Sequence, residues 1–551
     1  MSSPPPSPFL PLPTSTTVPL ATTTGAPHVP VTAAAPHPAV LTPEELTGAI
    51  RDLATAVHGI RLYLDDPYGP QPAAPPPGAN GPSLLPWQSL QPARQLLPPP
   101  ATTSGPNWEG GRYEGDDATR FETLSLAMEL GVDYVDIELK VADKFVDFLS
   151  GTKPDKCKLI VSSHNYESTP SCEELANLVA RIQEVGADIV KVATTATDIV
   201  DVSRMFQVMV HCQVPMIGLV MSERGLMSRV LSPKFGGYLT FGILDATKTS
   251  APGQPTLEEL LDIYNIRCIG PDTKVLGLIA NPVKQSKSPI LHNKCLQSVG
   301  YNAVYLPLLA DDLARFLDTY SSSDFSGFSC SLPFKVDAVH CCHEHDAVAK
   351  SIGAINTIIR KSDGKLVGYN TDYIGAISAI EDGIGGLGSK DAAISPLSGR
   401  LIVVVGAGGA AKAIAYGAKK KGARVVVANR TYEKAVTLAN AVGGQALRLD
   451  DLENFRPEEG TILANATSLG MYPNVDGTPV PKKALSFYDV VFDAVYAPKV
   501  TRLLREAEEH GVKVVSGVEM FVRQAIGQFE HFTGGVEAPE RLMREIAAQY
   551  T

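Results

Sequence analysis

Apolar and polar positions follow a repeating pattern along most of the chain. From about residue 106, apolar runs of six or seven residues are separated by longer segments in which apolar residues recur every three or four positions. This pattern predicts strands of a parallel sheet connected by helices. The predicted strands are 133–139, 158–163, 188–193, 215–221 and 238–243, and two of the predicted helices are 172–185 and 200–210.

The same pattern starts again at Lys274 and continues almost to the end of the chain. Strands that alternate with helices define an α/β protein. The length of 551 residues is enough for three or four domains of ordinary size. The predicted strands of this second half include 274–280, 327–332, 401–405 and 424–428, and its predicted helices include 289–299 and one that ends at about 421.

The first 105 residues follow neither pattern. They contain 24 of the 43 prolines, and residues 1–42 contain no Asp, Glu, Lys or Arg. Such a segment cannot bury enough surface to offset the entropy of folding, so we expect it to be disordered. A capping box, Thr42-Pro-Glu-Glu45, precedes apolar residues at helical spacing and predicts one helix over about 43–64. Plastid transit peptides share this composition but usually carry arginine, and the first basic residue here is Arg51.

The net charge of −11 argues against nucleic acid or an anionic membrane as a partner, because both favour a basic surface. We therefore expect a small-molecule partner. No apolar run reaches the roughly 18 residues of a membrane-spanning helix. The eight cysteines show no Cys-x-x-Cys spacing, which favours free thiols in a reducing compartment.

Charged side chains interrupt the strands predicted between residues 133 and 193. Lys191 lies inside an apolar strand, and His164 ends the strand before it. Asp136 and Glu138 stand two apart, so both point to one face of their strand. Burial lowers the pKa of a lysine toward that of a nucleophilic amine. The pattern predicts either Schiff-base catalysis with His164 as the proton carrier, or a buried structural network.

These residues belong to a recognisable series of motifs. EGGRYEGD, SSHNY, ADIVKVATTA, GLMSR and SAPGQPT, between about residues 106 and 269, closely resemble type I 3-dehydroquinate dehydratase, a TIM barrel, in the form that precedes shikimate dehydrogenase in plant bifunctional enzymes. The resemblance implies that Lys191 forms an imine with the substrate ketone and that His164 is the general acid and base. It also implies that the substrate is bound by Arg229, Ser250 and Gln254, in a site supported by Glu109, Asp136 and Glu138.

The sequence departs from this family in one decisive respect. The first three βα units are missing, together with a Glu-x-Arg pair, and Gly105 replaces an arginine four residues before Glu109. A barrel with five of its eight strands has unpaired edges and half of its substrate cage. We therefore predict that dehydratase activity is absent or very low.

Polar residues at loop and strand ends form a second set of candidates. Ser286 and Ser288 stand two apart in an extended loop and can face one ligand, although Ser288 precedes a proline and would also serve as a helix N-cap. Lys335 follows a predicted strand at the start of a predicted helix, where a cation gains nothing from the helix dipole. Asn356 and Asp372 stand at strand or loop ends, where polar residues commonly form turns.

The run His340-Cys-Cys-His-Glu-His345 carries metal-binding side chains. On a single helix these six residues point in all directions and cannot converge on a tetrahedron, although a pair such as Cys341 and His345 could. We therefore predict no metal site.

A glycine-rich segment, GAGGAA at 406–411, lies between a predicted strand and a predicted helix inside a βαβ unit. Glycines there let a pyrophosphate approach the helix N-terminus. NAD sites usually place an acidic residue at the end of the next strand, whereas this chain has Asn-Arg-Thr at 429–431. An arginine suits a 2′-phosphate, so the pattern predicts NADP. The candidate cofactor-binding residues are Gly406, Gly408, Gly409, Ala411, Asn429, Arg430 and Thr431.

The second half resembles shikimate dehydrogenase from about residue 274 to 550, through the motifs SKS, SLPFK, GAINT, YNTD, GAGGAAKA, ANRT, NATSLGM, DAVY and EMFVRQA in the family's order and spacing. The resemblance implies that Lys335 and Asp372 are the catalytic pair. It implies that Gly517 and Met520 line the nicotinamide. The implied substrate-binding residues are Ser286, Ser288, Ser331, Asn356, Tyr496 and Gln524.

The sequence as a whole predicts a monomeric NADP-dependent shikimate dehydrogenase fused behind a truncated dehydratase. The alternatives are a quinate dehydrogenase and a non-functional chimaeric chain. The family implies the plastid stroma, with the cytoplasm as the alternative because the leader is not a convincing transit peptide. The predicted parts are the leader (1–105), an incomplete barrel (106–269), a substrate-binding domain (273–395), a Rossmann NADP domain (396–515) and C-terminal helices that return to the substrate domain (516–551).

Overall fold

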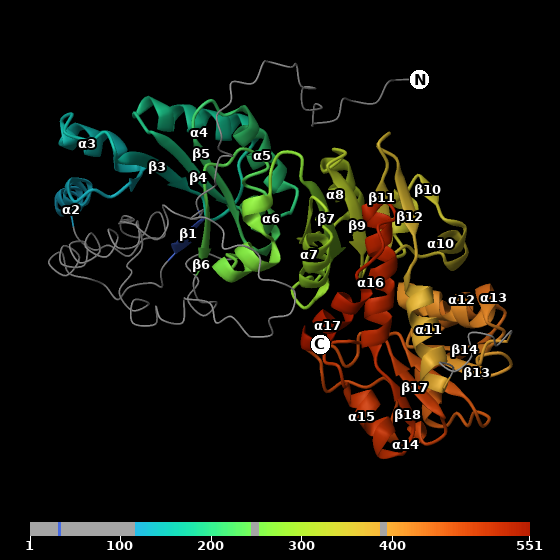
Figure 1. The fold of residues 1–551 in the computed structure, drawn as a ribbon. Helices are drawn as coiled ribbons and strands as arrows, with labels where there is room; N and C mark the ends of the chain where they lie inside the picture. The colour runs from blue at the N-terminus through green and yellow to red at the C-terminus, as the bar shows by residue number, and fades with distance from the viewer. Residues whose placement is uncertain (1–30, 35–115, 244–252, 386–393, 551) are drawn as a thin grey trace, which may run out of the picture. The chain divides into compact units, whose positions relative to one another are not determined.

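The computed structural model describes Val31–Ala34 and residues 116–243, 253–385 and 394–550. The chain divides into two compact units between Pro271 and Asp272. In both units, helices pack against sheets that are wholly or partly parallel (Figure 1), which confirms the predicted α/β class. No helix in these ranges has the length and apolar character needed to cross a membrane.

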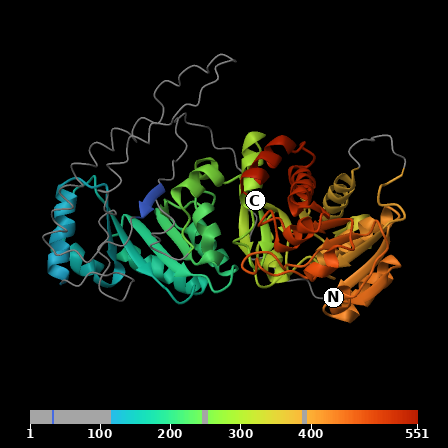
Figure 2. The same ribbon diagram turned by 90° about the horizontal axis from the view of Figure 1, so that it is seen from below.

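A four-stranded parallel sheet in the order β2-β3-β4-β5 forms the centre of the first unit (Figure 2). All positions of β5 and nearly all of β4 are buried, which explains why both are continuous apolar runs. The strands are β2 (Tyr134–Glu138), β3 (Lys158–His164), β4 (Ile189–Thr195) and β5 (Met216–Met221). The helices are α2 (Asp117–Glu129), α3 (Leu139–Leu149), α4 (Cys172–Glu184), α5 (Asp201–His211) and α6 (Leu226–Val230), with short turns of other helix types at Glu223–Gly225, Glu259–Ile263 and Ile266–Cys268.

The fifth predicted strand, β6 (Thr240–Ile243), pairs with a strand from the leader. This strand, β1 (Val31–Ala34), runs parallel to β6 in the register Val31 to Thr240. The composition of the leader did not predict a strand, because a period of two cannot be recognised over four residues between prolines. The pairing covers a backbone edge that we expected to be open. The predicted leader helix, 43–64, lies outside the described residues.

The second unit begins with a six-stranded sheet in the order β10-β12-β11-β9-β7-β8. β7 is parallel to both of its neighbours, whereas β11 is antiparallel to β9 and β12. The strands are β7 (Lys274–Ala280), β8 (Ala303–Leu309), β9 (Phe325–Cys330), β10 (Glu344–His345), β11 (Thr357–Arg360) and β12 (Leu366–Tyr369). The helices are α7 (Ser288–Ser298), α8 (Leu313–Thr319), α9 (Ala338–Cys341), α10 (Ala347–Ile352) and α11 (Asp372–Ile384).

The other sheet of this unit is fully parallel and has the order β15-β14-β13-β16-β17-β18. Strand order reverses between β13 and β16, the position at which doubly wound sheets bind nucleotides. The strands are β13 (Leu401–Val405), β14 (Arg424–Asn429), β15 (Gln445–Arg448), β16 (Ile462–Asn465), β17 (Val490–Asp493) and β18 (Lys513–Val515). The helices are α12 (Gly409–Lys420), α13 (Tyr432–Val442), α14 (Lys482–Leu485) and α15 (Arg502–Glu509), with a 3₁₀ turn at Leu449–Glu453.

Two C-terminal helices, α16 (Gly517–Thr533) and α17 (Glu540–Tyr550), return to the first of these sheets (Figure 1). Phe521 and Phe529 of α16 are buried in one cluster with Leu276 and Leu291 of the substrate side. α16 also lies close against α11, because a Cβ on Gly375 would be only 2.8 Å from the Met520 carbonyl oxygen. The helix therefore fixes the start of α11 relative to the sheet.

Three local predictions are wrong. Ser288 is the first residue of α7 and not its cap, because Lys287 holds that position. Lys335 lies in a turn before α9, and its carbonyl oxygen accepts a hydrogen bond from the Ile355 amide (2.7 Å) that a helix would have used internally. The run 340–345 is not one helix, since α9 ends at Cys341 and β10 begins at Glu344.

Two of the three histidines of that run contact the backbone. His343 Nδ1 accepts a hydrogen bond from the Leu366 amide (3.1 Å), and His345 Nε2 lies 2.7 Å from the Val339 carbonyl oxygen. Pairing of β10 with β12 therefore overrides the helix that the sequence favoured. Across the described ranges, no three His, Cys, Asp or Glu side chains converge on a common point for a metal ion.

Candidate active sites

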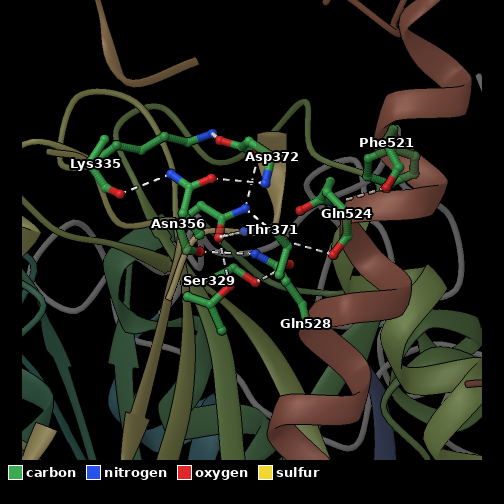
Figure 3. Close-up of polar contacts among 11 residues, drawn as sticks. Ser329, Lys335, Asn356, Thr371, Asp372, Phe521, Gln524 and Gln528 are labelled. Carbon is green, nitrogen blue, oxygen red and sulfur yellow. Dashed lines mark hydrogen bonds and ion pairs between the residues drawn. The ribbon is translucent and has the colours of Figure 1, made fainter. Parts of the chain in front are cut away.

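Lys335 and Asp372 form a close ion pair in the second unit. The Lys335 Nζ lies 2.5 Å from the Asp372 Oδ2 (Figure 3). Lys335 comes from the turn after β9, and Asp372 is the first residue of α11. The side chain of Asp372 is 3% exposed and that of Lys335 is 19% exposed, so the carboxylate is buried while the amine keeps an open side. A lysine oriented in this way can exchange a proton with a bound hydroxyl.

Asn356 holds the other oxygen of this carboxylate. Its Nδ2 donates to the Asp372 Oδ1 and to the Thr371 Oγ1, both at 2.9 Å (Figure 3). Its Oδ1 accepts from the Thr371 amide (2.9 Å) and from the Thr357 hydroxyl (2.8 Å). Because Asn356 is 1% exposed and all its side-chain groups are used, the amide has a fixed orientation. Asp372 is thereby left with one oxygen for Lys335.

Helix α16 supports this arrangement from behind (Figure 3). The Gln528 Nε2 donates to the Asn356 carbonyl oxygen (2.9 Å), and its Oε1 accepts from the Ser329 hydroxyl (2.8 Å). The Thr371 hydroxyl donates to the backbone carbonyl of Gln524 (2.9 Å). Sequence reasoning selected Gln524 and missed Gln528, although a spacing of four residues places both on one face of the helix. In this structure the Gln524 Nε2 donates to the Phe521 carbonyl oxygen (2.9 Å).

The two serines of the SKS loop lie beside two tyrosines, of which Tyr305 is buried and Tyr496 is partly buried. The Ser286 hydroxyl accepts from the Ser288 amide (3.2 Å). Burial raises the pKa of Tyr496, and a hydrogen bond with the Ser286 hydroxyl opposes that shift. Burial likewise raises the pKa of Tyr305, against opposing contributions from hydroxyl groups that include Ser288. The Tyr496 ring also stacks on Phe521, with centroids 4.2 Å apart.

Ser331 connects β9 to the turn that carries Lys335. Its amide donates to the Ile279 carbonyl oxygen (3.0 Å), and its own carbonyl oxygen accepts from the Phe334 amide (2.8 Å). The predicted substrate residues of the second unit thus come from the segments after β7, β9 and β17, from the start of β11 and from α16.

The glycine-rich loop leaves space in front of α12. Gly406 has a φ of +112°, which favours glycine. A Cβ on Gly408, the N-cap of α12, would meet no protein atom within 4 Å, so protein packing does not require a glycine there. Behind the loop, Ala411 and Met520 share one buried core. An open helix N-terminus lined by glycine fits the pyrophosphate of a dinucleotide.

The segment Asn429-Arg430-Thr431 follows β14 and leads into α13. The Asn429 Nδ2 donates to the Thr431 carbonyl oxygen (2.9 Å), and Arg430 and Thr431 are exposed. Thr431 is the N-cap of α13 but makes no side-chain cap bond, so the first amides of the helix keep their capacity for an anion. At the start of α16, a Cβ on Gly517 would lie 2.7 Å from the Asp493 carbonyl oxygen, so this position requires glycine.

Lys191 and its neighbours lie on one face of the first unit's sheet. The Lys191 Nζ is 2.5 Å from the Asp136 Oδ2 and 5.1 Å from the centre of the Phe241 ring. Glu138 pairs with Arg120 at 3.1 Å, and Arg120 is fully buried. Sequence reasoning did not single out Arg120, because a lone basic residue on a helix carries no pattern. Both interpretations of the sequence, Schiff-base catalysis and a buried structural network, therefore stay predictions.

The other predicted dehydratase residues are only partly described. His164 ends β3 and stacks on Tyr166, with ring centroids 6.2 Å apart. Arg229 in α6 is buried, burial lowers its pKa to about 10, and its Nε has no hydrogen-bond partner among the described residues. A buried guanidinium of this kind suits a carboxylate ligand. Gln254 is partly buried, and Glu109 and Ser250 lie outside the described residues.

Comparison with known families divides the chain at similar places. Residues 92–271 match type I 3-dehydroquinase, and residues 278–358 match the shikimate dehydrogenase substrate binding domain. Residues 390–469 match the shikimate/quinate 5-dehydrogenase family, and residues 517–547 match the shikimate 5′-dehydrogenase C-terminal domain. The first match begins before residue 106, where the sequence pattern placed the start of the barrel.

Individual relatives align with about half of the chain. A shikimate dehydrogenase (NADP(+)) of Methanocaldococcus jannaschii is 37% identical over 276 residues, which are 48% of this chain and 93% of that protein. A crystal structure of a shikimate dehydrogenase in complex with NADP+ covers 51% of this chain and 96% of its own, at 36% identity and a TM-score of 0.44.

A bifunctional relative aligns with both units. The chloroplastic bifunctional 3-dehydroquinate dehydratase/shikimate dehydrogenase of Arabidopsis thaliana is 62% identical to this chain over 456 residues. The alignment covers 82% of this chain and 76% of the relative. The chain therefore belongs to the bifunctional 3-dehydroquinate dehydratase/shikimate dehydrogenase family.

Proposed function

We propose that the chain interconverts shikimate and 3-dehydroshikimate with NADP, in the shikimate pathway. The hydroxyl proton of shikimate passes to the Lys335 amine while hydride leaves the carbinol carbon. When bound, NADP supplies the nicotinamide that accepts this hydride. Asp372 orients the Lys335 amine and balances its charge, and Asn356 fixes the carboxylate. In the reverse direction Lys335 returns the proton to the carbonyl oxygen.

The main support for this proposal is that the ion pair of Lys335 and Asp372 lies beside the glycine-rich loop. Lys335 is 2.5 Å from Asp372, and the Lys335 side chain reaches the glycine-rich loop, because a Cβ on Gly409 would be 2.6 Å from the Lys335 Cβ. The proton-transferring group and the dinucleotide loop therefore border the same space. A hydride donor and a hydroxyl must be held side by side for transfer.

Substitution of Lys335 tests the proposal. Lys335→Met keeps an unbranched stem against Gly409 and removes the amine, so we expect turnover to fall by about 10²- to 10⁴-fold. NADPH binding, measured by fluorescence titration, should keep its wild-type affinity. Wild-type turnover by this variant would exclude the proposed role of Lys335.

Shikimate is the substrate that we favour over quinate, because both serines of the SKS loop are present. Initial rates of NADP reduction over a range of shikimate and of quinate concentrations give kcat/KM for each substrate and separate the two. A larger kcat/KM with quinate would identify a quinate dehydrogenase instead.

We propose further that the dehydratase domain has lost its lyase activity. The support for this proposal is the comparison of the sequence with the family it resembles, by which three βα units of the barrel and their Glu-x-Arg pair are missing. Borohydride reduction in the presence of 3-dehydroquinate, followed by intact mass measurement, should leave the chain unmodified. An adduct that forms on the wild type and not on Lys191→Ala would show that the imine still forms.

The chloroplastic location in the name of the Arabidopsis relative supports a plastid location for this chain, which we propose. We also propose that the chain is a monomer. Light scattering of the purified protein should give a single species near 58.6 kDa. Aggregation without dehydrogenase activity would favour the chimaeric, non-functional alternative.

A further inference from the structure

A second arginine lies beside the segment at which the sequence predicts the 2′-phosphate of NADP. Arg448 is the last residue of β15, and its Cα is paired in register with that of Asn429 at the end of β14. Neighbouring strands lie about 4.8 Å apart. Because both strands run in the same direction, Arg448 and Arg430 both lie at the carboxyl ends of the strands. Arg448 is outside the ANRT motif and is exposed.

Tyr432 holds this arginine over the beginning of α13. The guanidinium carbon of Arg448 is 4.8 Å from the centre of the Tyr432 ring, a distance typical of a cation–π contact. Tyr432 is the first residue of α13, so the stack lies at the helix N-terminus, where backbone amides and the helix dipole attract anions. Stacking uses the face of the guanidinium and leaves its N–H edge available to donate.

Among the described residues, no carboxylate neutralises the positive charges of Arg430 and Arg448. Neither Arg430 nor Arg448 forms an ion pair or a hydrogen bond with a carboxylate in the part of the chain that the structure describes. Glu433 and Asp450 are the exposed acids nearest to these arginines in the sequence. Among the described residues, neither acid forms an ion pair or a hydrogen bond with Arg448. Two guanidinium groups beside an uncapped helix start match the three oxygens of a phosphate monoester.

We propose that Arg448 is a specificity-determining residue for the cofactor, which donates to the 2′-phosphate together with Arg430. The inference rests on the proposed NADP-dependent function, and names a residue that favours NADP over NAD. Arg448 contacts only the added phosphate, so the rest of the dinucleotide and the hydride transfer do not depend on it.

Two nucleotide probes isolate that phosphate. In calorimetric titrations of the full chain, Arg448→Ala should weaken binding of 2′,5′-ADP by about three- to tenfold, the effect of one partly exposed charged contact. Binding of 5′-AMP, which lacks the 2′-phosphate, should not change. Arg448→Lys, which keeps the charge without the planar fork, should give an intermediate loss. Tyr432→Phe retains the ring and should bind as the wild type does, whereas Tyr432→Leu should weaken only 2′,5′-ADP.

Arg456 provides a matched control. Its guanidinium carbon is 4.1 Å from the centre of the Phe487 ring, so it is another stacked arginine of the same domain. It precedes β16, and Phe487 precedes β17, which places this stack at the opposite edge of the sheet. Arg456→Ala should therefore leave both titrations unchanged.

The outcomes separate the inference from the proposed function. If Arg448→Ala binds 2′,5′-ADP as the wild type does, or loses equal affinity for both probes, the role of Arg448 is wrong while the NADP assignment stands. If the wild type itself binds 5′-AMP as tightly as 2′,5′-ADP, the NADP assignment fails and the role of Arg448 fails with it.

Discussion

Gly409 and Lys335 occupy adjoining space: a Cβ added to Gly409 would lie 2.6 Å from the Lys335 Cβ and 3.0 Å from its Cδ. Separations under 3.0 Å are essentially never seen for real Cβ atoms. Gly409, the second of the paired glycines, is therefore required because a larger residue would collide with the Lys335 side chain. The first of the pair, Gly408, has no such neighbour. Adjacent glycines thus serve different parts of the site.

Alanine at each glycine should separate these two roles. Gly409→Ala displaces the Lys335 stem, and a displacement of about 1 Å can lower turnover by about 10²-fold. We expect a fall in kcat of that order, with little change in the dissociation constant for NADPH. Gly408→Ala should do the reverse, because its methyl group enters the space for the dinucleotide. Kinetics at saturating NADP and fluorescence titration measure both; equal effects from the two variants would contradict the assignment.

Removing the charge of Asp372 should disable Lys335 without disturbing Asn356. Asp372→Asn keeps an oxygen that can accept from the Asn356 Nδ2, but it presents an amide to the Lys335 amine. The lysine then loses the carboxylate that orients it, and we expect kcat to fall by about 10²-fold or more. The KM for shikimate and the melting temperature should change little. A variant with wild-type kcat would show that the ion pair is structural only.

Buried His292 should make the second unit sensitive to acid. It is fully buried between Tyr305 and Phe532. Burial lowers its pKa from 6.5 to about 3. In that interval the unfolded chain binds the proton and the folded chain does not, so stability is lost as the pH falls below 6.5.

His292→Phe removes this dependence. Between pH 6.5 and 4.5 the free energy of unfolding should fall by about 2–3 kcal/mol more in the wild type than in the variant. Urea unfolding at the two pH values, followed by a probe in the second unit, measures the difference. If the wild type and the variant lose stability in parallel, His292 is protonated in the folded state after all.

Asp493 should make the protein less stable as the pH rises, which is the opposite of the pH dependence expected from His292. Burial raises its pKa from 3.8 to about 6, despite hydrogen bonds from Thr501, Asn465 and the Val495 amide. Between these values the folded chain binds the proton and the unfolded chain does not. The contribution of Asp493 to stability is therefore complete below pH 3.8 and is lost as the pH rises through 6.

Asp493→Asn tests this sign. The amide keeps an oxygen for the Val495 amide, and the Thr501 hydroxyl can turn to accept from the new NH₂ group. Relative to the wild type, the free energy of unfolding of the variant should increase by about 2 kcal/mol between pH 4 and pH 7. A difference that stays constant over this range would contradict the raised pKa of Asp493.

Local pattern was enough to predict much of the fold. Neighbouring residues alone predict the buried strands β4, β5, β13 and β14. They also predict the glycine-rich turn before α12. Lys335 was placed on a helix because its turn depends on a bond to Ile355, which no local pattern reveals. Gln528 was missed for the same reason, since its partner Asn356 is 172 residues away. The strand β1 has neither an apolar period nor a turn signal.

The position of helix α16 in the sequence determines when the chain can become active during its synthesis. The Gln528 side chain and the Gln524 backbone carbonyl of this helix hold Asn356 and Thr371, yet the helix follows both sheets in the sequence. A nascent chain that already contains the lysine, the carboxylate and the glycine-rich loop is still without this support. Enzymatic activity should therefore begin only after α16 has been synthesised, and a premature stop codon anywhere before α16 should abolish it even where both sheets have folded.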